Sequence, residues 1–595
     1  MKNSVHILFC VILTIGISAC SGTGLESKTN DSYYSPEWAR GIVWYQIFPE
    51  RFRDGDPNNQ PDRERARGPE GWKVTDWTQD WYKRDQWEKE HTDDFYAIVR
   101  ERRYGGDLQG VIDKLDYLKD LGVGGIYFNP VFDAQSMHKY DASYYHHIDR
   151  NFGPYPDRDA EQFLEEDPGN SETWEWTSAD SLFLDLIKEA HKRDLKVVID
   201  GVWNHTGTEF WAFQDLIKNQ EDSPYKDWYI VNTFDDPATP DTNEFDYEGW
   251  WGFKGLPVFH EQNETLVRPI RDHIFAVTRR WMDPNGDGDP SDGIDGWRLD
   301  VAEEVGVEFW REWHELVYEL NPNAITVAEI WTEKAKEYIS ADLFTSVMNY
   351  RFAYAAKDLL IDDKISTDEF VERLKQIDSD YPEGAGHVLQ NLMDSHDTAR
   401  LASFTVNQGI EYEGESHPRD GFKVRKPNED ERRLQKLVAL FQFSWKGAPM
   451  IYYGTESGMW GADDPDDRKP MVWEDMDYET ESHHPYGETR PEDDNNFDQE
   501  LFKYYRQLAH LRNGSDILKY GEAEIHHHNN DRKLVIFTRS LNGKKIVTVL
   551  NRSESDQTID LSEWTDAKTM KDLLTGNTLD ASSVSIKPVS GVILK

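Results

Sequence analysis

The sequence predicts an α/β fold, a (β/α)8 TIM barrel with an inserted subdomain after its third strand and a C-terminal antiparallel β-sandwich. Short apolar runs alternate with longer segments of helical periodicity through most of the chain, as in proteins built on a parallel sheet. A long aromatic-rich stretch interrupts this alternation, and the last part of the chain changes to short strands joined by turns. With 595 residues, the chain is long enough for a barrel of about 250 to 400 residues and a smaller companion domain.

Eight strand candidates follow one another along the chain. They are residues 41–49, 125–132, 196–200, 293–300, 324–331, 344–350, 388–396 and 449–454. Helical candidates come between or after them, at residues 108–121, 181–193, 265–282, 307–320, 367–377, 430–445 and 497–512. Eight strands in alternation with helices predict a closed parallel barrel over residues 36–512.

Two other segments extend this plan. Residues 206–262 are rich in Trp, Tyr, Phe, Gly and Asp and are too long for an ordinary connection, which predicts a small subdomain over the barrel mouth. Strand candidates 534–539 and 545–550 flank Asn542 and Gly543, a pair typical of a hairpin turn. Residues 513–595 are therefore expected to form the β-sandwich.

The first 19 residues have the layout of a secretory signal peptide. Lys2 precedes a mostly apolar run at 5–17, which is too short to span a membrane comfortably, and small residues follow it. Residues 17–20, Ile-Ser-Ala-Cys, resemble a bacterial lipobox, which implies a lipid on Cys20, with a plain cleavage site as the alternative. Residues 20–35 would then be a polar tether. Because Ser21 is not the Asp that retains lipoproteins at the inner membrane, we expect an exported lipoprotein of the bacterial outer membrane, on its periplasmic or its cell-surface face.

The charge balance excludes some partners. There are 66 basic and 112 acidic residues, a formal net charge of -46, which repels phosphate backbones and anionic lipid headgroups. We therefore expect no nucleic-acid partner, and contact with a membrane only through the N-terminal lipid. Ordinary surface solubility or a saline habitat would account for the acidic excess. Cys10 would leave with the signal peptide, so no disulfide is expected in the mature chain.

Acidic and histidine side chains lie at the ends of several predicted strands. In a parallel barrel such positions converge on one pocket, so Asp200, Asp300, Glu329 and Asp397 become candidates for one polar site. Retaining glycoside hydrolysis needs an attacking carboxylate and a carboxylic acid about 5 to 5.5 Å away, roles that Asp300 and Glu329 can fill. Arg298 lies two residues before Asp300 and therefore on the same face of the strand, where its charge is expected to keep Asp300 ionised.

Together these motifs identify a resemblance to a known family. Asp200 with Asn204 and His205, Arg298 with Asp300, then Glu329, then His396 with Asp397 resemble the four conserved regions of the α-amylase family, glycoside hydrolase family thirteen. Residues 105–110, 391–398 and 464–470 are similar to its neopullulanase and cyclomaltodextrinase branch.

The resemblance implies a role for each matching residue. Asp300 would be the nucleophile, Glu329 the general acid/base, and Asp397 the acid that grips sugar hydroxyls as the ring distorts. The implied substrate-binding residues are Tyr140, His205, Arg298, Trp331 and His396. The branch's N-terminal β-domain has no room before Trp38, so a monomer is expected rather than the branch's dimer.

Two oxygen-rich segments predict sites for structural calcium. By resemblance to the branch's calcium loop, the first would use Asp54, Asp56, Asn59, Gly105 and Asp107, with a plain acidic turn as the alternative. Residues 283–289 alternate oxygen-bearing side chains like the start of a calcium-binding loop, which makes Asp283, Asn285, Asp287 and Asp289 the second candidate set. Ile294 falls where such a loop ends in Glu, so a solvated turn remains the alternative there.

The expected function is that of a retaining α-glucan hydrolase. It would cleave α-1,4 linkages in maltosaccharides, starch, pullulan or cyclodextrins through a covalent glycosyl-enzyme intermediate. A transferase of the same family is the nearest alternative, because water and a second sugar compete for that intermediate. An α-1,6-specific enzyme and a catalytically inert surface glucan-binding protein are the others, although all three acids are present.

Overall fold

The computed structural model describes residues 32–236, 238–239, 244–414 and 416–595. The signal peptide and Cys20 lie outside these residues. From Tyr33 onward the chain forms one compact unit. The Tyr33 hydroxyl donates to the Thr345 carbonyl (2.5 Å), and Ser35 is buried. Residues 33–35, which were expected to belong to the tether, are therefore part of the folded unit. None of the described helices is both long and apolar enough to cross a membrane.

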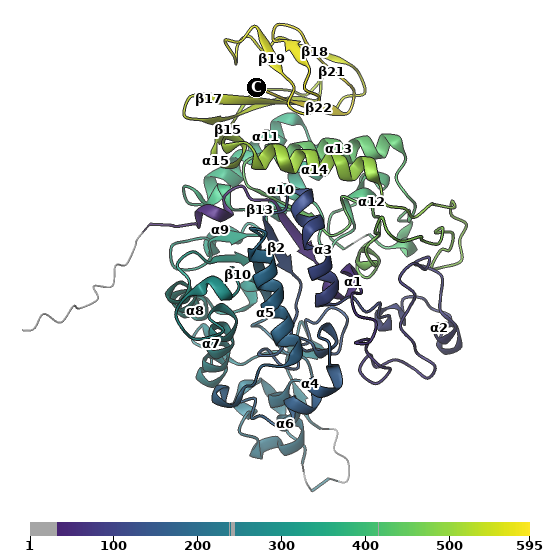
Figure 1. Cartoon of the computed structure of the whole chain (residues 1–595), viewed down its shortest axis with the longest axis vertical. Helices are drawn as coiled ribbons and strands as arrows, with labels where there is room; N and C mark the ends of the chain where they lie inside the picture. Colours follow the sequence, from purple (N-terminus) through teal and green to yellow (C-terminus); the bar gives the residue numbers. More distant parts are fainter. Residues whose placement is uncertain (1–31, 237, 240–243, 415) are drawn as a thin grey trace, which may run out of the picture. The chain divides into compact units, whose positions relative to one another are not determined.

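Eight parallel strands form the barrel (Figure 1). They are β1 (Trp44–Ile47), β2 (Gly125–Phe128), β3 (Lys196–Gly201), β10 (Gly296–Leu299), β11 (Ile325–Ala328), β12 (Ser346–Val347), β13 (Gln390–Asn391) and β14 (Ala448–Tyr452). In the sheet they follow the order β12-β11-β10-β3-β2-β1-β14-β13. A parallel bridge from Met348 to Gln390, with the Asn349 N–H donating to the Gln390 carbonyl (2.8 Å), joins the two ends. All eight predicted strands are confirmed, and all but β3 are shorter than the run that predicted them.

The predicted helices are also present. They are α3 (Leu108–Leu121), α5 (Ser178–His191), α7 (Arg268–Met282), α8 (Val307–Leu320), α11 (Thr367–Asp380), α13 (Glu429–Ser444) and α14 (Gln499–Asn513). Local signals set their ends: Asp107 caps α3 by accepting the Gly110 N–H, and Gly122 ends it in a left-handed conformation (φ 97°). Shorter helices fill the connections, namely α4 (Pro156–Phe163), α6 (Trp211–Asn219), α9 (Ala335–Tyr338), α10 (Tyr350–Ala356) and α12 (Leu401–Val406).

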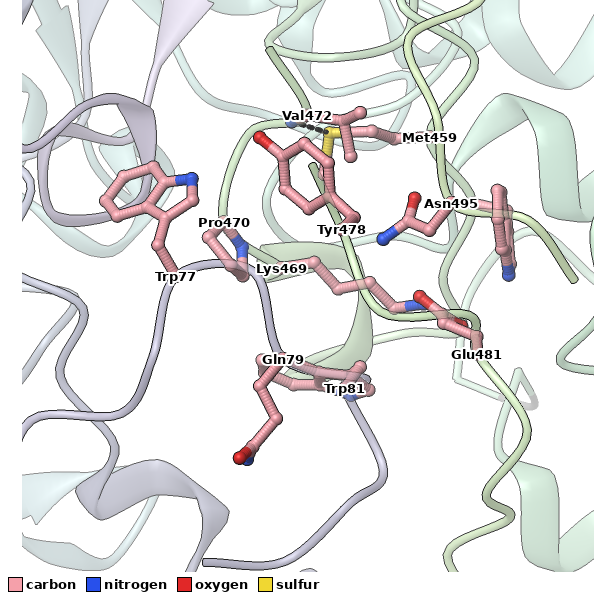
Figure 2. A pocket seen from close by; sticks show the side chains of 11 residues that line it. Trp77, Gln79, Trp81, Met459, Lys469, Pro470, Val472, Tyr478, Glu481 and Asn495 are labelled. Carbon is pink, nitrogen blue, oxygen red and sulfur yellow. Dashed lines mark hydrogen bonds and ion pairs between the residues drawn. The ribbon is translucent and has the colours of Figure 1, made fainter. Parts of the chain in front are cut away.

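A long excursion between β1 and α3 was not predicted. Residues 53–107 contain the short helix α2 (Gln86–His91) and pack against the segment after β14 through Asp466. The Asp466 carboxylate accepts hydrogen bonds of 2.7 Å from Trp81, Tyr82 and Tyr96 of the excursion. Trp77 and Trp81 of this excursion line a small cavity together with Lys469 and Glu481 (Figure 2). Its volume is about 10 Å³, roughly the room that one water needs. The excursion is thereby fixed against one side of the barrel mouth.

The insertion after β3 forms a small subdomain of short strands with α6. Its strands are β4 (Val231–Thr233), β5 (Asp246–Tyr247), β6 (Gly249–Trp250), β7 (Phe253–Pro257) and β8 (Glu261–Gln262), and β9 (Thr265–Leu266) pairs with β8. An antiparallel bridge between His205 and Val258 ties this subdomain to the loop that leaves β3. The predicted insertion thus lies next to a predicted site residue.

The C-terminal region is an antiparallel sheet with two smaller ribbons (Figure 1). Strands β15 (Glu522–Asn529), β16 (Leu534–Leu541), β17 (Lys544–Asn551) and β22 (Ser590–Leu594) form the sheet, while β18 (Gln557–Ile559) pairs with β21 (Val584–Ile586) and β19 (Thr569–Lys571) with β20 (Thr578–Asp580). Residues of β16 alternate between two cores: Phe537 packs against Trp445 of the barrel, whereas Ile536 faces the ribbons. A short helix, α15 (Asp516–Tyr520), precedes the first strand.

Candidate active site

Strand register brings the predicted acids together around one guanidinium. Arg298 pairs with Asp200 across β10 and β3, and Leu299 pairs with Ala328, so Asp300 and Glu329 follow neighbouring strand positions. Arg298 Nη1 lies 2.9 Å from both Asp200 carboxylate oxygens and 3.0 Å from Asp300 Oδ1. Its Nη2 lies 2.9 Å from Glu329 Oε2. Because the guanidinium nitrogens are fixed in one plane, these contacts keep the two bound carboxylate oxygens within roughly 8 Å of each other.

Arg298 itself does not line the pocket. Its side chain is 0% exposed, and its polar contacts are with acids, with Tyr140 and with the sulfur of Met348. Arg298 thus lies beneath the acids and positions them, and the expectation that it also binds substrate stays a prediction. Burial makes these charge pairs strong because the surrounding medium screens them poorly.

Glu329 is oriented by two further donors. The Val301 N–H donates to Oε2 (2.9 Å) and the Trp331 indole N–H to Oε1 (3.0 Å). Val301 has a left-handed backbone (φ 38°, ψ 50°), which is strained for a β-branched residue. This conformation comes directly after Asp300 and turns the amide toward Glu329, so the strain serves the geometry of the acid pair.

Tyr140, His396 and Asp200 form a connected network. The Tyr140 hydroxyl lies 2.6 Å from His396 Nε2 and donates to Asp200 Oδ2 (2.9 Å), and the two rings stack at 5.4 Å. Gln46 Nε2 lies 2.8 Å from His396 Nδ1. An amide nitrogen donates, so His396 accepts at Nδ1 and carries its proton on Nε2, toward Tyr140. Burial holds the pKa of His396 well below its usual range, consistent with this neutral ring.

A cavity of about 850 Å³ opens above these residues. Its lining includes seven of the eight predicted catalytic and substrate-binding residues: Tyr140, His205, Asp300, Glu329, Trp331, His396 and Asp397. His205 offers a free polar atom there, since its buried Nε2 has no hydrogen-bond partner among the described residues. Burial lowers the pKa of His205 to about 3, so this ring is neutral. The cavity is large enough for a sugar chain.

Aromatic side chains of the insertion form one wall of this cavity. Trp250 stacks on His205 at 5.7 Å and on Trp251 at 4.9 Å. Trp251 is 82% exposed and Phe253 63% exposed, which is unusual for rings of this size. Exposed flat faces on a cavity wall suit stacking against sugar rings.

Asp397 ends a chain of alternating charges. Arg468 Nη2 donates to Asp397 Oδ1 (3.1 Å), Arg468 Nη1 contacts Asp464 (3.1 Å), and Arg100 donates to the other oxygen of Asp464 (2.6 Å). The Asp397 side chain is 31% exposed to the cavity. Burial, opposed by Arg468 and reinforced by Glu329, raises the pKa of Asp397 to about 7.

The electrostatics of Asp300 correct one expectation. Burial raises the pKa of Asp300 well above its ordinary value, the neighbouring Glu329 raises it further, and Arg298 lowers it. The prediction that Arg298 keeps Asp300 ionised is therefore wrong for the free site, because burial and the like charge outweigh the guanidinium. Asp300 therefore holds its proton more tightly in this site than an exposed aspartate does.

The first predicted calcium loop folds around Asp107. Its carboxylate accepts from the backbone amides of Gly55 (3.1 Å) and Asp56 (2.8 Å) and from the Asn59 side chain (2.9 Å). Three buried oxygens beside it, Asp54 Oδ1, Asn59 Oδ1 and Gln60 Oε1, have no hydrogen-bond partner among the described residues. Burial and the nearby Asp107 and Asp56 raise the pKa of Asp54 to about 6. A Cβ added at Gly105 would lie 2.1 Å from the Gln60 amide, so only glycine fits there.

The second candidate loop bonds mainly to its own backbone. Asn285 Oδ1 accepts the Asp287 N–H, Asp287 Oδ1 accepts the Asp289 N–H (both 2.8 Å), and Asp283 Oδ2 accepts the Gly288 N–H (3.1 Å). Asn285, Asp287 and Asp289 are exposed. These contacts form a turn, Asp283 Oδ1 keeps no hydrogen-bond partner among the described residues, and the calcium assignment stays a prediction.

Sequence reasoning missed three residues that complete the site. Gln46 sets the His396 tautomer, Tyr127 donates to Asp200 (2.8 Å), and Arg100 anchors Asp464. Gln46 and Tyr127 lie in β1 and β2, where alternation along the strand could have marked them as polar groups facing inward. Arg100 comes from the excursion, and no local signal places it at the barrel mouth.

Comparison with known proteins agrees with this geometry. The family model described as the catalytic domain of alpha amylase matches residues 46–166 and 177–521. Neopullulanase 2 of Thermoactinomyces vulgaris is 34% identical over 95% of this chain and 79% of its own length, and a cyclomaltodextrinase of Geobacillus thermopakistaniensis is 32% identical over 95% and 78%. The solved ligand-free cyclic alpha-maltosyl-(1→6)-maltose hydrolase of Arthrobacter globiformis superposes with a TM-score of 0.68 and 27% identity, over 94% of this chain and 99% of that one.

Proposed function

The chain belongs to the α-amylase family of glycoside hydrolases, in its neopullulanase and cyclomaltodextrinase-like part that acts on α-glucans, and from this we propose that it hydrolyses α-1,4 linkages with retention of anomeric configuration. The observation that carries the proposal is the pairing of Asp300 and Glu329 on one guanidinium at the floor of the 850 Å³ cavity. Maltosaccharides from starch, pullulan or cyclodextrins are the proposed substrates.

In the proposed first step, Asp300 attacks the anomeric carbon while Glu329 protonates the oxygen of the leaving sugar. The bond from that carbon to the glycosidic oxygen breaks, and a glycosyl ester on Asp300 forms. Glu329 then takes a proton from water, which cleaves the ester and restores both acids. The hydrogen bonds from the Val301 N–H and the Trp331 indole to Glu329 support this division of roles, because they hold its carboxyl group beside Asp300.

The surrounding residues hold the sugar at this pair. Asp397, Tyr140, His205 and His396 face the cavity, and we assign them to the hydroxyls and the ring face of the sugar at the cleavage point. Trp331 stacks on Tyr350 at 3.8 Å, which fixes its indole beside Glu329 for the leaving sugar. Such preorganised contacts lower the barrier because they need no rearrangement during the reaction.

Product analysis of a maltotriose digest tests the proposal. Hydrolysis gives glucose and maltose, whereas dominant oligomers longer than the substrate would favour the transferase. Following the first product by NMR decides between retention and inversion. Absence of any product from starch, pullulan, β-cyclodextrin and maltotriose would favour an inert glucan-binding protein, and cleavage of isomaltose with maltose spared would favour an α-1,6-specific enzyme.

We also propose structural calcium at the loop around Asp107. The unpartnered oxygens of Asp54, Asn59 and Gln60 fit a hard cation, with Asp56, Gly105 and Asp107 around them. Gln60 is an addition to the predicted set. The ion would supply a fixed charge that holds the start of the excursion to α3, with no part in the reaction.

Export and a lipid on Cys20 complete the proposal. If this holds, the folded unit that begins at Tyr33 would be tethered to the outer membrane of a bacterium, as a monomer. Replacing Cys20 by Ala should move the protein from the membrane fraction to the soluble one after cell lysis. An unchanged membrane fraction would contradict lipidation at this residue.

A further inference from the structure

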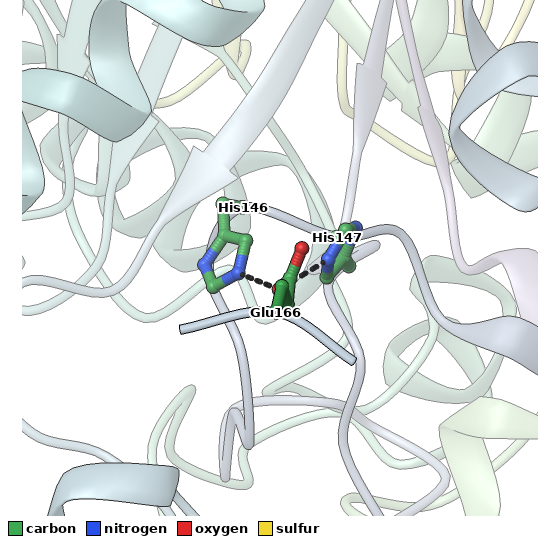
Figure 3. A group of neighbouring side chains, drawn as sticks. All are labelled: His146, His147 and Glu166. Carbon is green, nitrogen blue, oxygen red and sulfur yellow. Dashed lines mark hydrogen bonds and ion pairs between the residues drawn. The ribbon is translucent and has the colours of Figure 1, made fainter. Parts of the chain in front are cut away.

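A second cluster of potential metal ligands lies outside the cavity. His146 and His147 belong to the loop after β2, and Glu166 belongs to the segment between α4 and α5 (Figure 3). Both histidine side chains are 0% exposed and Glu166 is 2% exposed. No residue of this group contacts the predicted catalytic acids, so it needs a separate explanation.

The three side chains point at one spot. Nε2 of His146 and Nε2 of His147 lie 2.8 and 2.9 Å from the same oxygen, Oε1 of Glu166. All three potential ligand atoms lie within 4.8 Å of one another. Ligands of a tetrahedral zinc ion are about 3.3 Å apart when bonds are about 2.0 to 2.1 Å, so small shifts admit an ion.

Neighbouring groups hold the two imidazoles in place. Asp180 Oδ2 lies 2.8 Å from His147 Nδ1, which turns Nε2 toward Glu166. Asp180 is itself fixed by the Ile148 amide (2.7 Å) and by Arg280 (3.0 Å). A carboxylate behind a histidine is the usual support of a metal ligand. Trp174 stacks on His146 at 4.1 Å with an angle of 7°, and so fixes that ring.

We propose that His146, His147 and Glu166 bind a divalent transition-metal ion, zinc in class, which fastens the loop after β2 to the segment before α5. Two imidazoles and one carboxylate select this class, because calcium and magnesium prefer oxygen ligands alone. His146 Nδ1 is buried without a partner among the described residues, so the hydrogen bond to Glu166 is the one polar contact that these residues give its ring. Binding an ion would give the buried His146 ring a function besides this hydrogen bond.

The role of the ion would be structural. The loop after β2 also carries Tyr140, and the Tyr145 hydroxyl donates to the Val202 carbonyl (2.7 Å) beside β3. Fastening this loop at His146 and His147 would therefore hold the cavity side that presents Tyr140. Without an ion, His146, His147 and Glu166 form a hydrogen-bonded network. In this network the carboxylates of Asp180 and Glu166 outweigh burial and raise the pKa of His147 to about 9.

The zinc content of the full chain tests the proposal. The protein is produced with zinc in the medium, dialysed and analysed by mass spectrometry of the metal. Wild type and the control His527→Gln, in the histidine run of β15, should carry about one zinc per chain. Glu166→Gln should carry less than about a tenth of this, although Gln keeps the shape and can still accept a hydrogen bond from an imidazole.

Thermal unfolding gives a second measurement, which holds even if a variant folds poorly. A strong zinc chelator should lower the Tm of the wild type by several degrees, and added zinc should restore it, because an ion that binds only the folded state stabilises it. The Tm of Glu166→Gln should respond to neither. Wild-type protein with no more zinc than Glu166→Gln, or with a Tm that zinc and chelator leave unchanged, would overturn the proposal in favour of the hydrogen-bonded network.

Discussion

The substitution Arg298→Lys tests the role of the guanidinium beneath the acids. Arg298 contacts Asp200, Asp300 and Glu329 from two terminal nitrogens and is fully buried. Lysine keeps the charge but presents it at one point, so it can remain on one of these carboxylates. The change therefore removes geometry rather than charge.

The structure sets the size of the effect. If lysine stays on Asp200, the hydrogen bond to Asp300 and the ion pair with Glu329 are lost, at about 1.5 to 3 kcal/mol each. If half of this free energy stabilises the transition state of the reaction, kcat decreases roughly 10- to 150-fold, since about 1.4 kcal/mol corresponds to a factor of ten. The other half lowers the free energy of unfolding by roughly 1.5 to 3 kcal/mol.

The assay is maltosaccharide hydrolysis at saturating substrate, with unfolding followed in parallel. Arg400→Lys is the matched control, because Arg400 is equally buried but donates to the carbonyls of Asp467 (2.8 Å) and Tyr453 (2.7 Å). The control should lose stability while its kcat stays within about threefold of wild type. If Arg298→Lys also keeps kcat within about threefold, Arg298 does not position the acids and the reasoning fails.

Three further predictions concern other parts of the site. Asp397→Asn should abolish activity, yet it should raise the Tm at pH 8 by roughly 1 to 3 °C and leave the Tm unchanged near pH 4. The pKa of Asp397 is about 7 in the folded protein, above its value in the unfolded chain, so the wild type loses stability as the pH rises from the unfolded to the folded pKa. Partial exposure of the side chain limits the size of this effect. An equal or lower Tm at pH 8 would contradict this sign. Trp251→Ala should raise KM for long glucans roughly 2- to 10-fold with little change in stability, whereas Tyr155→Ala, also exposed, should change neither. After treatment with EDTA, added calcium alone should raise the wild-type Tm. Asn59→Ala should lose this recovery with calcium, and its neighbour Asn58→Ala should keep it. A wild type whose Tm calcium does not raise would reject the calcium site.

The barrel was predictable because its signal is local. Most strands lie in apolar runs buried on both faces, as at β3, and several helices have a capping side chain, as α3 has in Asp107. Strand lengths were overestimated because pairing, rather than hydrophobicity, ends a strand: β12 and β13 keep two residues each. Apolar residues beyond them pack without joining the sheet.

The excursion at 53–107 escaped prediction for a different reason. It lacks long periodic segments, and its fold depends on distant partners such as Asp466, which receives three of its donors. Arg100 therefore reaches the cavity through contacts that no sequence spacing encodes. The same holds for Glu166, twenty residues from the histidines that it meets.

The sequence by itself determined the eight strands, their order along the chain and the acids at their ends, because strand periodicity and strand-end position are properties of neighbouring residues. The tertiary structure alone decided that Arg298 lies beneath Asp300 and Glu329, and that burial outweighs its charge in setting the pKa of Asp300. Desolvation and the approach of like charges depend on everything that surrounds a carboxyl group, and most of those groups are far away along the chain.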